Sequence, residues 1–431
     1  MNMNNLKFTV FLLACIFGFQ SVNAQKGAKS AADYEVVAKD AAWCWFSDPR
    51  AVYHKGNHER IYYGYINSKG DVLISARDVN SGAIQTFVLH EKLQIDDHNV
   101  PTILFLPDGK MITFYNEHSG DVFMRRSVNA EDITAWEDEV KLTFNNNRFC
   151  YTNPVMLSEE NNRIYIFGRQ VGKGFTQWWQ YYSYSDDLGK TWKEDKIYLD
   201  NKNRDNPPYL KITSDNKSRI DVLFTDGHPK IGPDVSVYHM YYEKGNFYQT
   251  NGEMLGPING APIEIAKVNK IYDASQNNIR GWIWDIALDK NKRPVVTYSR
   301  YPNENDHRYN YAYWDGSKWI DQEISKSGGW MPSLKQDDKV REAHYSGGVV
   351  LDHQDPSNVY LSRQIEGYFE IEHKRWNGRK WKVTPITSNS TINNIRPYVV
   401  DGNTNRKPIL LWMTGFYNHY TSYNTDLRIK E

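Results

Sequence analysis

Cysteine is scarce in this sequence, with 3 residues in 431. Cys15 lies in an N-terminal apolar run, so a processed chain would keep only Cys44 and Cys150. Two widely separated cysteines exclude a fold that is stapled by disulfides. Their spacing also matches no metal-binding motif. The fold must therefore be held together by a hydrophobic core.

An excess of charge of either sign is absent as well. The chain has 52 basic and 52 acidic residues, so its formal net charge is zero. This balance argues against a protein that binds nucleic acid through bulk positive charge, and we expect no nucleic-acid partner. Any anionic ligand must be held by a local cluster of basic side chains.

Long apolar runs are missing after the N-terminus. Lys7 precedes the apolar run 8–19, and 22–24 (Val-Asn-Ala) offers a small-residue cleavage site, so residues 1–24 are predicted to be a secretory signal peptide. A lipobox-like stretch that ends at Cys15 is the weaker alternative. No later run has the length of a membrane span. We therefore expect a secreted or periplasmic monomer without a membrane span.

A repeated β-hairpin is the main feature that is present. Residues 96–118 predict a strand, a turn at 107–109 (Pro-Asp-Gly) and a second strand. Aromatic residues, at 14%, favour strands over helices. The same frame recurs along the chain. Its seven copies begin at Pro49, Pro101, Pro154, Pro208, Asp285, Gly348 and Pro397.

A second hairpin lies between successive copies and is marked by glycine and an aromatic residue. The stretch 185–192 (SDDLGKTW) fits an Asp-box, and looser versions occur at 242–247, 314–319 and 376–381. Two hairpins per repeat make four strands, and seven repeats predict an all-β, seven-bladed β-propeller formed by a single domain, residues 25–431. An open β-sandwich array and two unrelated β domains are the alternatives.

Three further segments are assigned by their position in this frame. Residues 34–38 can complete the last blade and close the ring. The stretches 252–278 and 326–341 are insertions, and long loops on a rigid scaffold often carry ligand contacts.

The repeat frame places two sets of residues around one mouth of the propeller. The first set stands before the inner strands and contains Phe46, His98, Tyr151, Asp205, Trp282, a position near His344, and Asn394. The second set stands at the ends of the second strands and contains His118, Arg169, His228, Arg300 and Arg363. Converging basic groups predict an anionic ligand, and Tyr151, Tyr209 and Trp282 would stack on sugar rings. Inter-blade ion pairs are an equal alternative for Arg300 and Arg363, and His98 and His118 could be ordinary surface residues.

These residues carry a resemblance to a known family. The sequence resembles the seven-bladed propeller polysaccharide lyases, above all the ulvan lyases and the related L-rhamnose-α-1,4-D-glucuronate lyases. The motifs are AWCWFSDPRAV at 42–52, DDHNVP at 96–101, His118, Tyr151 and Gly168-Arg169. The resemblance implies β-elimination at rhamnosyl-α-1,4-glucuronate linkages of an acidic polysaccharide such as ulvan. It implies His98, His118, Tyr151 and Arg169 as catalytic residues and His228 as a uronate ligand. The repeat frame adds Tyr209, Arg300 and Arg363 as substrate-binding residues.

Elimination next to a uronate needs a neutralised carboxylate, a base for the C5 proton and an acid for the leaving oxygen. We expect Arg169 to neutralise, His98 to be the base and Tyr151 the acid, with His118 orienting the substrate or sharing the base role. No cofactor or metal is then required, although a structural ion in the channel is left open.

Three other functions stay open. A related α-L-rhamnosidase family resembles the segment 43–49, but its catalytic histidine would fall on Ser47. The Asp-box suggests a sialidase-like hydrolase, and a non-catalytic glycan-binding propeller is the third alternative.

Overall fold

The computed structural model describes residues 28–431 apart from 143, 145–147, 172–177, 202–205, 230–231, 233, 304, 330–345 and 403–406. The predicted signal peptide, residues 1–24, lies outside the described residues. Within them, no helix combines the length and the apolar character that crossing a membrane requires.

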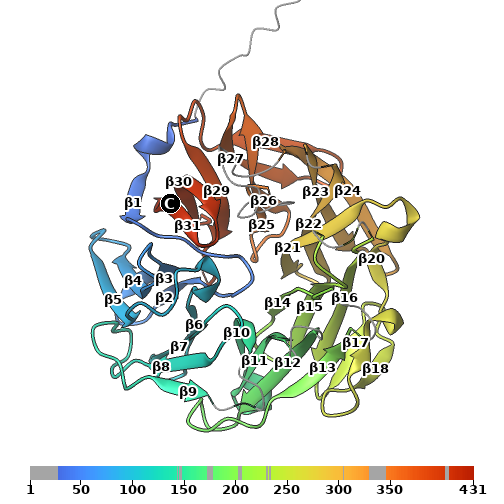
Figure 1. The fold of residues 1–431 in the computed structure, drawn as a ribbon, viewed down its shortest axis with the longest axis horizontal. Helices are drawn as coiled ribbons and strands as arrows, with labels where there is room; N and C mark the ends of the chain where they lie inside the picture. Colours follow the sequence, from blue (N-terminus) through green and yellow to red (C-terminus); the bar gives the residue numbers. More distant parts are fainter. Residues whose placement is uncertain are drawn as a thin grey trace, which may run out of the picture.

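Seven antiparallel sheets stand in a ring around a central axis (Figure 1). We number them as blades along the chain and give the strands from the centre outward. Blade 1 consists of β2 (Ala51–Lys55), β3 (Glu59–Ile66), β4 (Val72–Asp78) and β5 (Ile84–His90). Blade 2 consists of β6 (Thr102–Phe105), β7 (Met111–Asn116), β8 (Val122–Arg126) and β9 (Val140–Leu142). Blade 3 consists of β10 (Phe149–Leu157), β11 (Arg163–Val171), β12 (Trp178–Ser185) and β13 (Lys196–Asp200). Blades 4 to 7 are β14 (Leu210–Ser214), β15 (Arg219–Thr225), β16 (Val237–Glu243), β17 (Asn246–Gln249); β21 (Arg280–Leu288), β22 (Pro294–Asn303), β23 (Asp306–Trp314), β24 (Trp319–Gly328); β25 (Val349–Leu351), β26 (Asn358–Ile365), β27 (Tyr368–Trp376), β28 (Trp381–Pro385); and β29 (Asn393–Val399), β30 (Leu410–His419), β31 (Ser422–Lys430), β1 (Glu35–Ala38).

The predicted seven-bladed propeller with four antiparallel strands per blade is confirmed. Each predicted hairpin supplies the two inner strands of one blade, and the Asp-box forms the turn between β12 and β13. Closure by the N-terminal segment is confirmed too, because β1 pairs with β31, with Glu35 opposite Ile429. The first and last strands therefore share blade 7, as Figure 1 shows beside the C-terminus.

In the described part of the chain, short 3₁₀ turns interrupt the strands at η1 (Ala31–Asp33), η2 (Asp97–Asn99), η3 (Ser158–Glu160), η5 (Ile265–Lys267) and η6 (Ala274–Gln276). The insertion 252–278 contains two of them and three strands, β18 (Met254–Pro257), β19 (Ile263–Glu264) and β20 (Lys270–Tyr272). β18 and β20 extend blade 4, and β19 pairs with β13 of blade 3. This insertion therefore joins two blades. Most of the other predicted insertion, 326–341, lies outside the described residues.

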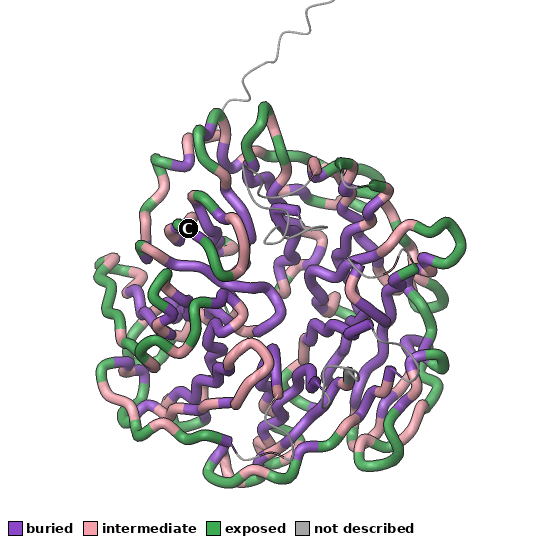
Figure 2. Tube along the Cα trace, in the orientation of Figure 1, coloured by how far each residue is buried: buried purple, intermediate pink, exposed green. Residues whose placement is uncertain are grey.

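The core lies between the blades. Inner strands such as β10 and β21 are buried along nearly their whole length, whereas outer strands such as β5 and β28 are largely exposed. Figure 2 shows this gradient from the centre to the rim. Neighbouring blades thus bury their faces against one another, and the hydrophobic effect holds the ring closed.

A charged cluster joins three blades at the end of the inner strands opposite the predicted mouth. His353 Nε2 lies 3.0 Å from Asp285 Oδ1 of blade 5, and His353 Nδ1 lies 3.5 Å from Asp401 Oδ1 of blade 7. Burial alone would lower the pKa of His353, but Asp285 and Asp401 outweigh it and raise the pKa to about 9. His353 is therefore an imidazolium at neutral pH. The cluster borders a cavity of about 580 Å³.

This cluster predicts a loss of stability at alkaline pH. Because the folded-state pKa of His353 lies above its unfolded value of about 6.5, its contribution is complete below that value and is lost as pH rises through about 9. His353→Gln should lower the thermal unfolding midpoint at pH 7, and the difference from the parent should shrink toward pH 10. Unfolding curves of both proteins across this range test it; a constant difference would contradict it.

Candidate active site

Two stacked histidines form the centre of the site. His98 belongs to η2 and His118 follows β7, and their rings lie 4.1 Å apart at an interplanar angle of 17°. Asp96 orients both: its Oδ1 lies 2.5 Å from His98 Nδ1 and its Oδ2 lies 3.0 Å from His118 Nδ1. The same carboxylate accepts a hydrogen bond from the His98 backbone and caps η2. The hairpin thus brings both histidines to one place, as predicted.

The surroundings shift the pKa values of the two histidines in opposite directions. Burial lowers the pKa of His98, but Cys44 and Asp96 outweigh it and raise the pKa well above the ordinary value. Burial and the charge of His98 lower the pKa of His118. Burial would raise the pKa of Asp96, but the two histidines hold it below its ordinary value. These opposite shifts favour a charged His98 beside a neutral His118, in contrast to the expectation that His98 is the base.

Tyr151 stands beside the histidines because β10 bulges there. Its φ is +64°, and the pairing register with β11 shifts between Cys150 and Asn153. This left-handed backbone costs about 1–3 kcal/mol for a residue other than glycine, and the bulge redirects the side chain. Gly168 on β11 makes room, because a Cβ there would lie 2.9 Å from the carbonyl oxygens of Cys150 and Tyr151.

The phenol of Tyr151 is fully buried. Its ring centroid lies 5.5 Å from that of His98, and burial raises its pKa well above the ordinary value even though Arg169 opposes this. Within the described part of the chain, its Oη has no hydrogen-bond partner. An unpaired hydroxyl in a buried site is costly, so this atom is a candidate for contact with a ligand.

Arg169 supplies a buried cation next to Tyr151. It is 2% exposed, and its guanidinium carbon lies 4.8 Å from the Tyr151 ring centroid and 4.3 Å from that of Tyr209. Its Nη2 lies 3.5 Å from Cys150 Sγ. Burial lowers the pKa of Arg169, but Tyr209, Tyr151 and Cys150 outweigh it and raise the pKa. The guanidinium is therefore charged and held against two aromatic faces.

Aromatic side chains continue the site from Tyr151 toward blade 5. Phe46 lies 5.0 Å from Tyr151 and 5.4 Å from Trp282 between ring centroids. His228 lies 5.4 Å from Tyr209 and 4.9 Å from Trp282. The structure therefore brings together six of the eight predicted site residues: His98, His118, Tyr151, Arg169, Tyr209 and His228.

Arg300 and Arg363 do not join this cluster. Arg300 forms an ion pair with Asp321 and lies over Tyr272 at 4.1 Å, and Arg363 lies 2.8 Å from Glu372. Each ion pair lies within one blade, so the alternative of inter-blade pairs is also wrong.

Of the three other predicted mouth positions, Asn394 lies within the described residues and does not add to the cluster. Asn394 is buried and forms hydrogen bonds with Trp412 and Thr414. The positions at Asp205 and near His344 lie outside the described residues.

The sequence reasoning missed two residues that orient the histidines. Asp96 belongs to the motif DDHNVP at 96–101, but the sequence alone suggested no role for it. Tyr420, in the turn between β30 and β31, has its ring centroid 4.9 Å from that of His98 and 5.4 Å from that of His118. Its carbonyl oxygen accepts a hydrogen bond from the Asp97 backbone. Tyr420 is more than three hundred residues away in sequence, so no local signal could have found it.

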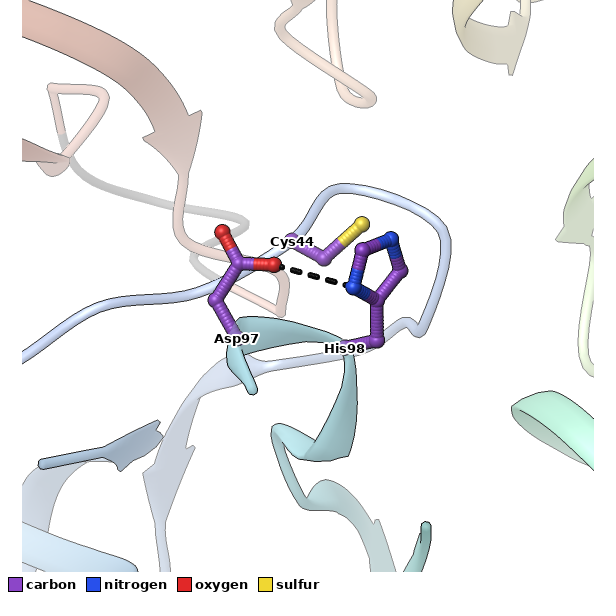
Figure 3. Close-up of side chains that lie close together, drawn as sticks. All are labelled: Cys44, Asp97 and His98. Atoms are coloured by element: carbon purple, nitrogen blue, oxygen red, sulfur yellow. Dashed lines mark ion pairs between the residues drawn. The ribbon is translucent and has the colours of Figure 1, made fainter. Parts of the chain in front are cut away.

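Among the described residues, two groups of side chains have donors close enough to hold a metal ion. One consists of Cys44, Asp97 and His98 (Figure 3), and the other of Asp96, His98 and His118. In each group the donor atoms lie within 4.8 Å of one another. Cys44 therefore has metal-binding neighbours that its position in the sequence did not reveal.

Comparisons with known proteins agree with the fold. Two structures of a polysaccharide lyase described as an ulvan lyase, one bound to -[GlcA(1-4)Rha3S]-, are similar at 15% and 16% identity. For both the TM-score is 0.67, covering 91% of this chain and 94% of that chain. An α-L-arabinanase from Penicillium chrysogenum complexed with arabinobiose has a TM-score of 0.49 at 12% identity, covering 92% and 98%. The predicted structural resemblance to the ulvan lyases is therefore confirmed at the level of the fold.

A search of curated protein sequences finds none that matches this chain. A family model described as a BNR repeat-containing family member matches residues 60–327, from β3 in blade 1 to β24 in blade 5. This match spans more than half of the sequence, and the chain therefore belongs to the BNR repeat-containing family.

Proposed function

We propose that this protein is a polysaccharide lyase that cleaves an acidic glycan by β-elimination next to a uronate. The rhamnosyl-α-1,4-glucuronate linkage of ulvan is the proposed target, and export by the N-terminal segment would bring the enzyme to this polymer. The observation that carries the proposal is the convergence of two stacked imidazoles, a buried tyrosine hydroxyl and a buried guanidinium. The bound glycan of the similar ulvan lyase, -[GlcA(1-4)Rha3S]-, is consistent with this substrate class.

Arg169 is assigned to the uronate carboxylate. Its guanidinium is held by aromatic faces and a thiol, and a carboxylate can receive two parallel hydrogen bonds from it. His228, beyond Tyr209, would contact the same sugar. Withdrawing charge from the carboxylate makes the C5 proton acidic, and a fixed cation in a buried site does this without reorganisation.

Proton removal is assigned to His118. His98 Nδ1 lies between two carboxylates, 2.5 Å from Asp96 and 3.3 Å from Asp97, whereas His118 Nδ1 contacts Asp96 alone. His118 would accept the C5 proton on its other ring nitrogen. The electron pair then forms the C4–C5 double bond, the C4–O4 bond breaks, and Tyr151 donates its hydroxyl proton to the leaving oxygen. Because Tyr151 is fully buried, side chains above it must move when the glycan binds.

Hydrolysis by a pair of carboxylic acids fits these contacts less well. Asp96 is occupied by both histidines, and Asp97 accepts contacts from Arg396 and Tyr417. Retaining and inverting glycosidases need two carboxyl groups on opposite sides of the scissile bond. Neither aspartate is placed in that way, so elimination is the better use of this site.

Product absorbance tests the reaction class. Elimination leaves a C4–C5 double bond conjugated with the carboxylate, which absorbs in the ultraviolet, whereas hydrolysis does not. The mature protein incubated with ulvan should give rising absorbance, with a carboxyl-reduced glycan as the matched inactive substrate. Reducing ends released without absorbance would indicate a hydrolase, and binding without either signal would indicate a glycan-binding propeller.

Replacing Tyr151 by Phe tests the proposed acid. The variant keeps the ring and removes one buried hydroxyl, so turnover should fall by about 10²–10⁴-fold while the dissociation constant changes little. Steady-state kinetics and binding isotherms on the folded variant measure the two effects. Tyr198→Phe is a control, because Tyr198 is a buried tyrosine in β13 outside the cluster. Turnover near that of the parent would remove Tyr151 from the mechanism.

Replacing Arg169 by Lys tests the proposed carboxylate ligand. Lysine keeps the charge but loses the planar pair of donors, so both substrate binding and turnover should weaken, unlike the effect at Tyr151. Arg363→Lys is the matched control, since Arg363 pairs with Glu372 away from the cluster. Steady-state kinetics with intact ulvan measure substrate binding and turnover in both variants. Equal effects of both substitutions would argue against a specific role for Arg169.

A further inference from the structure

We infer that Cys44, Asp97 and His98 form a binding site for Zn²⁺ at the edge of the histidine pair. The three side chains offer one sulfur, one oxygen and one nitrogen donor within 4.8 Å of one another (Figure 3). Zinc accepts this mixture of ligands and binds in tetrahedral geometry. The inference concerns metal binding and is independent of the proposed reaction.

One carboxylate oxygen of Asp97 is held by hydrogen bonds, and the other is available to a metal ion. Its Oδ2 accepts hydrogen bonds from Arg396 Nη1 at 2.8 Å and from Tyr417 Oη at 2.6 Å. Its Oδ1 is fully buried and has no hydrogen-bond partner among the described residues, and it lies 3.3 Å from His98 Nδ1. Outer contacts that hold one carboxylate oxygen and leave the other for the ion are typical of metal sites.

Hydrogen bonds to its backbone N–H and carbonyl groups fix the position of Cys44. Its N–H donates to the Asp97 carbonyl at 3.0 Å, and its carbonyl accepts from Arg50 Nη1 at 2.7 Å. The residue is 1% exposed and unpaired with Cys150. A thiolate in this position is a soft ligand that favours zinc over calcium or magnesium.

The charges of the donor set balance those of the ion. One thiolate and one carboxylate supply two negative charges for Zn²⁺, and the imidazole binds as a neutral ligand. Asp96 Oδ1 lies 2.5 Å from His98 Nδ1, so Nε2 is the nitrogen that would bind the ion, and Asp96 would orient the ring as outer carboxylates do in zinc proteins. Three protein ligands leave the fourth tetrahedral position for water.

Cobalt substitution tests the site without reference to activity. The tag-free mature protein, stripped with a chelator, should bind one Co²⁺ per chain and show near-ultraviolet absorption from thiolate-to-cobalt charge transfer. Added Zn²⁺ should bleach this band at one equivalent. Cys44→Ser should lose the band, whereas Cys150→Ser should keep it, since Cys150 is the other buried free cysteine and lies against Arg169.

A second variant covers the case in which Cys44→Ser does not fold. Tyr417→Phe removes one hydrogen bond to Asp97 and keeps all three ligands, so zinc affinity should fall by about 10–100-fold. Competition with a chromophoric chelator measures it, and circular dichroism confirms folding. The inference is overturned if the stripped protein binds no Co²⁺, if the band survives in Cys44→Ser, or if Tyr417→Phe binds zinc as tightly as the parent.

Discussion

Arg396 reaches from the bulge of β29 to Asp97 in η2, and the two side chains are 1% and 0% exposed. The same guanidinium donates to the carbonyl oxygen of Trp43. This one cation thus joins the last blade, the N-terminal segment and the turn that carries His98. Removing one partner of such a buried ion pair costs about 3–5 kcal/mol, because the other charge stays unpaired in a low-dielectric interior. The position of His98 therefore depends on this contact as well as on its own hairpin.

The site is built by distorting regular strands. Tyr151 and Arg396 both have positive φ, at +64° and +50°, and both lie at register shifts in inner strands of the propeller. A straight strand would alternate its side chains between the two faces of a blade. The bulges instead turn a phenol and a guanidinium toward the mouth, and the packed blades on either side offset the strain.

Sequence periodicity was sufficient to predict the architecture, because blades repeat and each hairpin returns to the same mouth. It also placed His98, His118, Tyr151 and Arg169 correctly, since their positions follow from where strands begin and end. It failed for Arg300 because strand position gives the location of a Cα but does not reveal which acidic neighbour the side chain will meet. Asp321, two strands away in the same blade, pairs with Arg300, and no pattern in the sequence marks that contact.

Scarcity of cysteine in the sequence argued only against disulfides, yet the structure places both cysteines of the predicted mature chain at the site. Cys44 raises the pKa of His98, and Cys150 raises that of Arg169. Each thiol lies beside a cation that has been removed from water, where a polarisable sulfur replaces part of the lost hydration. At position 150, a carboxylate would pair with the Arg169 guanidinium more strongly than a thiol does. A buried thiol and two aromatic faces therefore surround the guanidinium of Arg169, whereas the carboxylate of Asp96 holds His98.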